Sequence, residues 1–315
     1  MKSAMSVDPT RHLIVPFAQS EGAGWLQAMA SLELKNLSQL LRGMKLISTD
    51  SGLADSLSPP HERALATALG MTASADGLIP WAALEAKAAP GQGWAVITPC
   101  HWAMGREHAT LTDPATLGLN EAKSRTLLAA MQPYFATEGI TLHYAQPTRW
   151  LAEGEVFRSL PTASLDRVLG RNVDKWLPDS KAIKLLQNEM QMLLYTHPIN
   201  DERAAKGQPL VNSFWLSGSG ALKHSAIGNP QVKTATKLMQ AAFTNDWAAY
   251  AQAWTQLDTT DIAQLVTQQK SGQTVRLSLC GESNAMTFES ARQGFLTRIR
   301  NTLSSQRAVD MLKQL

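Results

Sequence analysis

Short apolar runs alternate along the chain with segments in which apolar residues recur every three or four positions. The runs 12–17 and Trp94–Cys100 have the length and composition of buried strands. Between residues 181 and 195, Ile183, Leu186 and Met190 recur with helical spacing and predict one long amphipathic helix. Further strands are predicted at 140–145, 213–216 and 275–280, and further helices within 25–32, 37–44, 59–70, 120–133, 238–265 and 288–303.

Two of these helices carry clear end signals. Ser58 is a predicted N-cap with Pro59 in the first turn, and Gly70 supplies the left-handed residue that ends this helix. Asn120 is the predicted N-cap of a later helix. Pro133 should end or kink that helix, because its ring clashes with the preceding turn.

Strands separated by helices predict an α/β fold with a mostly parallel sheet and helices on both faces. No internal repeat or low-complexity linker interrupts the sequence, so a single domain over 1–315 is expected. The loop-rich stretch 153–178 is an insertion, a lid or a domain boundary, and the pattern does not choose among these.

The composition gives no sign of a nucleic-acid or membrane partner. The formal net charge is only +3 and no run of Lys and Arg is present, so neither nucleic acid nor a membrane surface is indicated. The two cysteines, Cys100 and Cys280, are too few for a disulfide framework and favour a cytoplasmic location. No apolar run approaches the roughly 20 residues of a membrane helix.

The segment 196–220 gathers the polar groups best suited to hold an anion. It leaves the long helix, enters a strand at Ser213 and is predicted to turn through glycines beyond it. Ligands of open α/β sheets bind beyond the carboxyl ends of strands, where glycines let backbone amides approach an anion. The predicted ligand is a small phosphorylated or carboxylated anion, and the alternative is a tight turn with a solvated loop. The ligand-binding candidates in this segment are His197, Asn200, Arg203, Asn212, Ser217, Gly218 and Gly220.

Two other places carry reactive side chains. Cys100 and His101 are neighbours on an extended segment and point to opposite sides, so they form no nucleophilic pair. His101 is kept as a ligand-binding candidate. His61 and Glu62 begin a helix and are weak catalytic candidates, since an imidazole can accept a phosphoryl group; alternatively, Glu62 only favours the helix dipole. No pair of candidates has a metal-binding spacing, so no metal and no cofactor is predicted.

The segment 196–220 resembles the archaeal-type cofactor-independent phosphoglycerate mutases of the alkaline phosphatase superfamily. The positions that match their motif are Asn200, Arg203, Gly207, Pro209, Asn212, Trp215, Gly218 and Gly220. Weaker matches are 34–41, which resembles a Pro-Asn-Leu-Asp helix start, and 59–70, which resembles the helix bearing the nucleophile. The resemblance implies an alkaline-phosphatase-like core and, in an active member, two divalent metal ions such as manganese.

Nearly the whole chain also resembles the bacterial RpfE-type regulatory proteins, which are themselves phosphoglycerate-mutase-like. The matching segments are 12–18, 58–70, 98–102, 159–178 and 186–201. This resemblance implies a regulatory role.

Residue types differ where the resemblance places the metal ligands and the nucleophile. The first strand ends in Phe17 and Ala18 where those enzymes have Asp-Gly, and His61 stands in place of their serine. The late strand runs into Cys280, Gly281 and Glu282–Ser283 where they have Gly-Asp-His. Loss of the dinuclear site is therefore predicted, leaving a non-catalytic regulatory or anion-binding protein. The alternatives are an active metal-dependent phosphoglycerate mutase or phosphatase, and a protein-interaction module with an unidentified protein partner.

Overall fold

The computed structural model describes residues 11–30, 32–71, 75–224, 231–290 and 308–315. The chain divides into two compact units. The first comprises Met1–Ala54, Pro59–Gly70 and Gly228–Leu315, and the second comprises Asp55–Ser58 and Met71–Ile227. This division differs from the single domain expected, because residues 71–227 build a separate sheet with its own core.

The first unit is built on a five-stranded sheet in the order β2-β11-β10-β1-β9. The bounds are β1 Arg11–Val15, β2 Met44–Ser51, β9 Val232–Thr234, β10 Val275–Cys280 and β11 Asn284–Ser290. Strand β1 runs parallel to β9 and β10, whereas β11 runs antiparallel to β10 and β2. The α/β class is confirmed, but the sheet is mixed rather than mostly parallel. A short connection follows β10, and a turn of that length can only bring the next strand back antiparallel.

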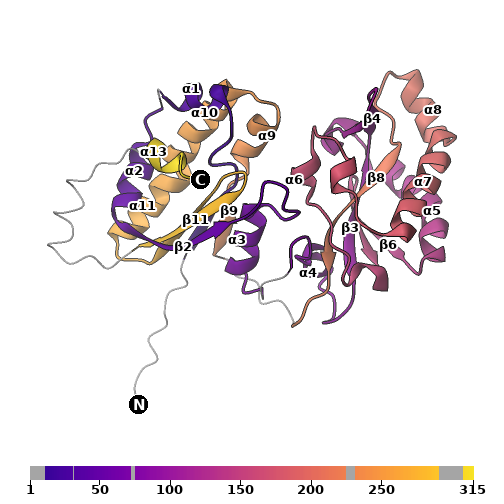
Figure 1. The fold of residues 1–315 in the computed structure, drawn as a ribbon, viewed down its shortest axis with the longest axis horizontal. Coiled ribbons are helices and arrows are strands. Elements are labelled where there is room, and N and C mark those ends of the chain that lie inside the picture. Colours follow the sequence, from indigo (N-terminus) through magenta and orange to yellow (C-terminus); the bar gives the residue numbers. More distant parts are fainter. Residues whose placement is uncertain (1–10, 31, 72–74, 225–230, 291–307) are drawn as a thin grey trace, which may run out of the picture. The chain divides into compact units, whose positions relative to one another are not determined.

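Helices cover both faces of this sheet (Figure 1). The larger helical layer consists of α1 Ala23–Ala30, α2 Lys35–Arg42, α9 Lys237–Phe243, α10 Trp247–Leu257, α11 Ala263–Lys270 and α13 Ala308–Leu312. Side chains alternate along β1, so that Leu13 and Val15 face this layer and Ile14 faces α3, Pro60–Ala68. The central strands β1 and β10 are thereby buried on both sides, whereas β2 at the edge is largely exposed.

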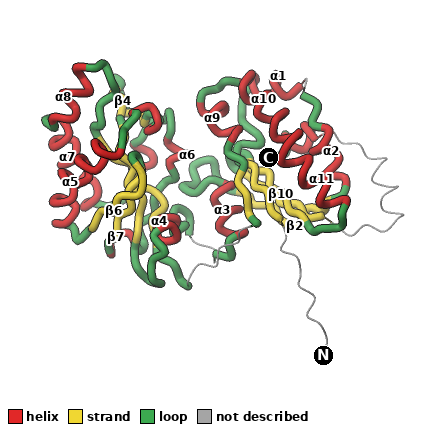
Figure 2. The backbone as a smooth tube through the Cα atoms, turned by 180° about the vertical axis from the view of Figure 1, so that it is seen from behind, coloured by secondary structure: helices red, strands yellow, loops and turns green. Residues whose placement is uncertain are grey.

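The second unit contains a four-stranded antiparallel sheet in the order β6-β7-β3-β8. Its strands are β3 Trp94–Cys100, β6 Thr141–Gln146, β7 Arg149–Glu153 and β8 Ser213–Gly220, and a separate hairpin pairs β4 Trp102–Met104 with β5 Ala109–Leu111. Figure 2 shows α5 Glu121–Thr137, α7 Lys181–Tyr195 and α8 Pro198–Ala205 on one side of the sheet and α4 Trp81–Glu85 on the other. All of β3 is buried, as its unbroken apolar run predicts.

The stretch 153–178 lies in the second unit. It contains the short helix α6 Leu165–Val168 and the 3-10 turns Glu155–Phe157 and Asp174–Trp176. Val168, Val173 and Trp176 are buried in a small cluster with Trp102 and Trp215. This part of the chain is packed into the second unit through apolar side chains.

Two helix-end predictions are confirmed, the Ser58 cap is wrong, and Pro133 does not end its helix. The Asn120 side chain accepts a hydrogen bond from the Lys123 amide at 2.9 Å and caps α5, and Gly70 adopts the left-handed conformation. Helix α5 continues through Pro133 to Thr137, because its buried stripe extends to both sides of the proline. Ser58 does not cap α3; its hydroxyl accepts from the Gly77 amide at 2.9 Å.

The predicted last helix also differs. Residues 288–290 belong to β11, and 291–307 lie outside the described residues. In the described part of the chain, no helix combines the length and the apolar character that crossing a bilayer requires.

Candidate functional site

His197, Asn200 and Arg203 lie at or on α8, directly after α7. His197 caps α8, with its Nδ1 accepting from the Ile199 amide at 3.2 Å. The Asn200 side chain donates to the carbonyls of Leu194 and Val211 at 2.8 and 2.7 Å and accepts from the Val211 amide at 2.9 Å. Asn200 therefore uses its amide within the fold.

Arg203 is held in the same way and is only 1% exposed. Its Nε donates to the Pro209 carbonyl at 2.6 Å and its Nη2 donates to the Leu117 carbonyl at 2.5 Å. Burial lowers the pKa of Arg203 from its ordinary value, since a buried guanidinium loses hydration. The guanidinium thus joins the loop after α8 to the 3-10 turn Pro114–Leu117.

Asn212 and His101 lie where β3 passes into β4. The Asn212 side chain accepts from the Trp102 amide at 2.7 Å and donates to the Trp102 carbonyl at 2.9 Å. His101 Nδ1 lies 2.9 Å from the Leu210 carbonyl. Both side chains link the residues before β8 to the end of β3. The structure therefore places His101 beside the segment 196–220, through a contact with a backbone carbonyl.

Ser217, Gly218 and Gly220 lie within β8, and the prediction that they form a turn beyond the strand is wrong. Gly218 and Gly220 have φ values of 58° and 139°, which favour glycine, and they accompany an irregularity in the pairing with β3. A Cβ at Gly220 would lie 3.1 Å from the Leu78 carbonyl. Because β8 is antiparallel to β3, its carboxyl end lies beside the amino end of β3, away from Cys100 and His101.

The carboxyl ends of β1 and β10, in the first unit, do meet. The two strands are parallel and in register, and the Ala18 amide donates to the Cys280 carbonyl at 2.8 Å. Phe17 has a left-handed φ of 53°, uncommon for a bulky residue, and its carbonyl accepts from the Tyr250 hydroxyl at 2.6 Å. Its ring lies 5.7 Å from the His61 ring and 4.8 Å from that of Phe243. An aromatic cluster therefore occupies this edge of the sheet.

Several polar side chains lie near this edge, and those with known partners are held within the fold. His61 is buried in the first turn of α3, and Glu62 beside it is half-buried. Burial raises the pKa of the Cys280 thiol well above its usual range, which keeps it protonated. Glu282 accepts from the Ser20 hydroxyl at 2.9 Å, and the nearby Asp50 forms an ion pair with Arg63 at 2.6 Å. Phe17, Ala18 and Cys280, at the strand ends, carry neither a carboxylate nor an imidazole.

Phe17, Ala18 and Cys280 are not the donor types of a dinuclear metal site. Such a site needs several oxygen and nitrogen donors that bridge or surround two cations. Where the resemblance implies ligands, the strand ends offer a phenyl ring at Phe17, a methyl group at Ala18 and a neutral thiol at Cys280. These three side chains therefore could not serve as the metal ligands that the resemblance implies at their positions.

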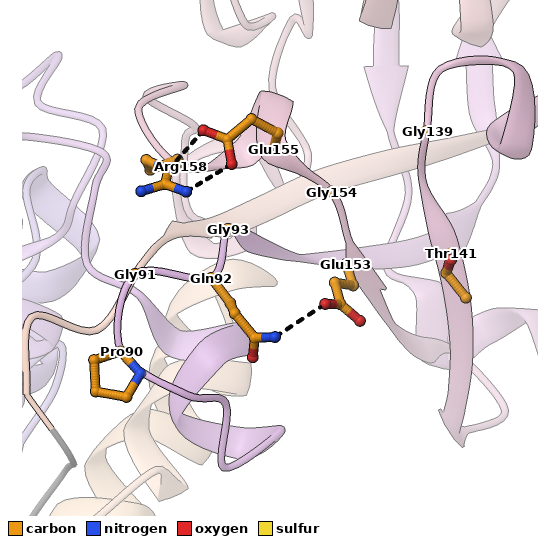
Figure 3. Close-up of a pocket in the computed structure, with 10 residues that line it drawn as sticks. All are labelled: Pro90, Gly91, Gln92, Gly93, Gly139, Thr141, Glu153, Gly154, Glu155 and Arg158. Atoms are coloured by element: carbon orange, nitrogen blue, oxygen red, sulfur yellow. Dashed lines mark hydrogen bonds and ion pairs between the residues drawn. The ribbon is translucent and has the colours of Figure 1, made fainter.

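The second unit has an open polar pocket of about 590 Å³ (Figure 3). Arg158 faces Glu155 and forms an ion pair with it at 2.7 Å, and Gln92 Nε2 donates to Glu153 Oε1 at 3.3 Å. Gly93 is required in its wall, since a Cβ there would lie 2.6 Å from the Gly154 carbonyl. No sequence motif marks this pocket, because its residues come from segments far apart in the chain. Its charged groups are satisfied mainly by one another, so it resembles a solvated surface more than a prepared site.

Comparisons with known proteins find distant structural similarity. No protein-family model matches the chain, and no curated protein does. The cofactor-independent phosphoglycerate mutase from Thermoplasma acidophilum DSM 1728 is 12% identical over 97% of this chain and 100% of its own, with a TM-score of 0.35. The PH0037 protein from Pyrococcus horikoshii is 10% identical over 98% of both chains, with a TM-score of 0.46. The similarity to RpfE-type regulatory proteins stays a prediction, while the chain shares a distant structural likeness with a cofactor-independent phosphoglycerate mutase.

Proposed function

We propose that this chain is a phosphoglycerate-mutase-like protein that has lost catalysis and acts by binding, in a regulatory role. The observation that carries the proposal is the meeting of Phe17, Ala18 and Cys280 at the carboxyl edge of β1 and β10. The segments that the resemblance assigns to metal ligation come together there, and their side chains at this edge are a phenyl ring, a methyl group and a thiol.

The physical reason concerns charge. A phosphoryl group in transfer carries negative charge on its oxygens, and paired cations neutralise that charge on the attacking and leaving sides. The Phe17 ring, the Ala18 methyl group and the protonated Cys280 thiol cannot replace the cations or hold them. His61 is the remaining candidate nucleophile, and its ring packs against that of Phe17.

A small phosphorylated or carboxylated anion remains the ligand proposed from the sequence. The hydrogen bonds of Asn200, Arg203 and Asn212 are directed to the backbone, which favours a structural role for these three side chains. His197 and Ser217 keep their place as candidates for anion binding, while an unidentified protein remains the alternative partner.

The proposal is tested by measuring interconversion of the phosphoglycerate isomers by the purified full chain in added manganese. We expect no turnover above a protein-free control, and the same result with His61→Ala and Glu62→Gln. Turnover that a chelator abolishes and that manganese restores would overturn the proposal, and its loss in His61→Ala would identify the nucleophile.

A further inference from the structure

A second pocket, of about 290 Å³, lies in the first unit between α11 and the amino-terminal ends of β1 and β9. Leu13 and Lys233 are paired in register, so their side chains share the face of the sheet that α11 covers, and Arg11 lies on that face two residues before Leu13. The opposite wall is the helical face of Asp261, Leu265 and Gln268.

The helical wall of this pocket lies at the margin of the apolar side of the helix. Ile262, Leu265 and Val266 are buried in the core of the unit. Asp261 and Gln268 are half-buried beside them, and Gln264 is exposed. Polar groups enclosed at such a place are ordinarily provided with partners.

A π-helical turn, Asp258–Ile262, precedes α11 and fixes which of its side chains line the pocket. It adds a residue to the turn, and such bulges re-aim side chains and occur frequently at functional sites. Asp258 accepts from the Leu37 amide at 2.7 Å and the Asn36 amide at 3.1 Å, at the start of α2. Three residues on, Asp261 forms an ion pair with Lys233 across the pocket. The turn thus places the Asp258 carboxylate at the start of α2 and the Asp261 carboxylate beside Lys233.

Two groups of the pocket are left to receive a ligand. Gln268 Oε1 is buried and, in the described part of the chain, has no hydrogen-bond partner. Arg11 has no carboxylate partner among the described residues and is exposed at the rim. An unsatisfied buried acceptor requires a donor, and a guanidinium is suited to a carboxylate. Leu13 and Leu265 supply an apolar floor beneath them.

We propose that this pocket binds an aliphatic amino carboxylate of amino-acid size. The ligand carboxylate pairs with Arg11 and Lys233, its amino group donates to Gln268 Oε1, and its side chain lies on Leu13 and Leu265. The pocket is at the amino-terminal end of β1, while the aromatic cluster around Phe17 is at the other end, so this inference stands independently of the proposed function.

The test uses three matched probes with the full chain: L-leucine, isocaproate, which lacks the amino group, and isoamylamine, which lacks the carboxylate. Binding is followed by ligand-observed NMR and calorimetry. We expect L-leucine to bind and each partial probe to bind at least about tenfold more weakly, since each omits one charge-assisted hydrogen bond. Absence of L-leucine binding, or equal binding of isocaproate, would overturn the proposal.

Variants locate the binding. Arg11→Met and Gln268→Met should each weaken L-leucine binding by about tenfold or more. Gln268→Met should also raise the melting temperature of the free protein, because it removes an unsatisfied buried acceptor. Lys270→Met is the matched control, since it removes a charge at the exposed end of α11. An equal loss of binding in Lys270→Met, or unchanged binding in Arg11→Met with circular dichroism intact, would contradict the assigned site.

Discussion

Arg203→Ala is expected to destabilise the second unit by about 3–5 kcal/mol. The substitution leaves the buried carbonyls of Leu117 and Pro209 without their donor and opens a cavity where the side chain lay. Chemical denaturation combined with hydrogen exchange of α8 and the loop after it measures the effect. Arg203→Lys should lower the free energy of unfolding by less than Arg203→Ala does, because lysine keeps a charge but lacks the planar fork.

Arg158→Ala is the matched control for Arg203. Arg158 is exposed and, among the described residues, pairs with Glu155, so its removal should leave the free energy of unfolding nearly unchanged. If Arg203 were an anion ligand instead, Arg203→Ala would leave the free energy of unfolding nearly unchanged and weaken binding of inorganic phosphate. That pattern would refute the structural role given to this side chain.

Acid should destabilise the first unit through His12. His12 is buried, and its Nε2 lies 2.8 Å from the Ser278 hydroxyl, which in turn lies 2.7 Å from that of Thr287. Burial first, and the charge of Arg276 second, lower the pKa of His12 from 6.5 to about 4. The folded state therefore holds this imidazole neutral at pH values where the unfolded chain protonates it.

The sign follows from proton uptake on unfolding. Between pH 6.5 and about 4 the unfolded state binds more protons, so the free energy of unfolding falls as the pH falls. The full loss is about 3 kcal/mol and is complete once the pH is below the folded pKa. His12→Gln should remove this part of the pH dependence, whereas His108→Gln, at an exposed position, should leave it in place. Equal pH profiles for the protein and His12→Gln, measured by urea denaturation, would be inconsistent with a neutral buried His12.

The sequence predicts the strongest elements of the fold well. The strands Trp94–Cys100 and Val275–Cys280 and the helix Lys181–Tyr195 have the bounds expected, because each combines an unmistakable apolar pattern with a suitable length. By contrast, β2 is an edge strand with exposed residues along most of its length, and so it carries no apolar signal. Local pattern also cannot show that 71–227 fold separately between parts of the first sheet.

For the candidate site too, the sequence predicts local features but not the contacts between distant segments. The residues His197, Asn200 and Arg203 are correctly placed after a long helix, but their partners are backbone groups up to 86 residues away, which no motif displays. The glycines at 218 and 220 do have positive φ, as the turn prediction requires, yet they lie inside an irregular strand. The pocket at Arg11 and Gln268 depends on strand register and a π-helical turn, and neither is visible in apolar periodicity.

Metal stoichiometry tests the loss of the dinuclear site most directly. Equilibrium dialysis of the full chain against manganese, followed by elemental analysis, counts the ions that one chain retains. The aromatic and thiol composition around Phe17 and Cys280 predicts that no pair of ions is held. Two manganese ions bound per chain, with at least one lost on substitution of His61 or Glu62, would contradict the account.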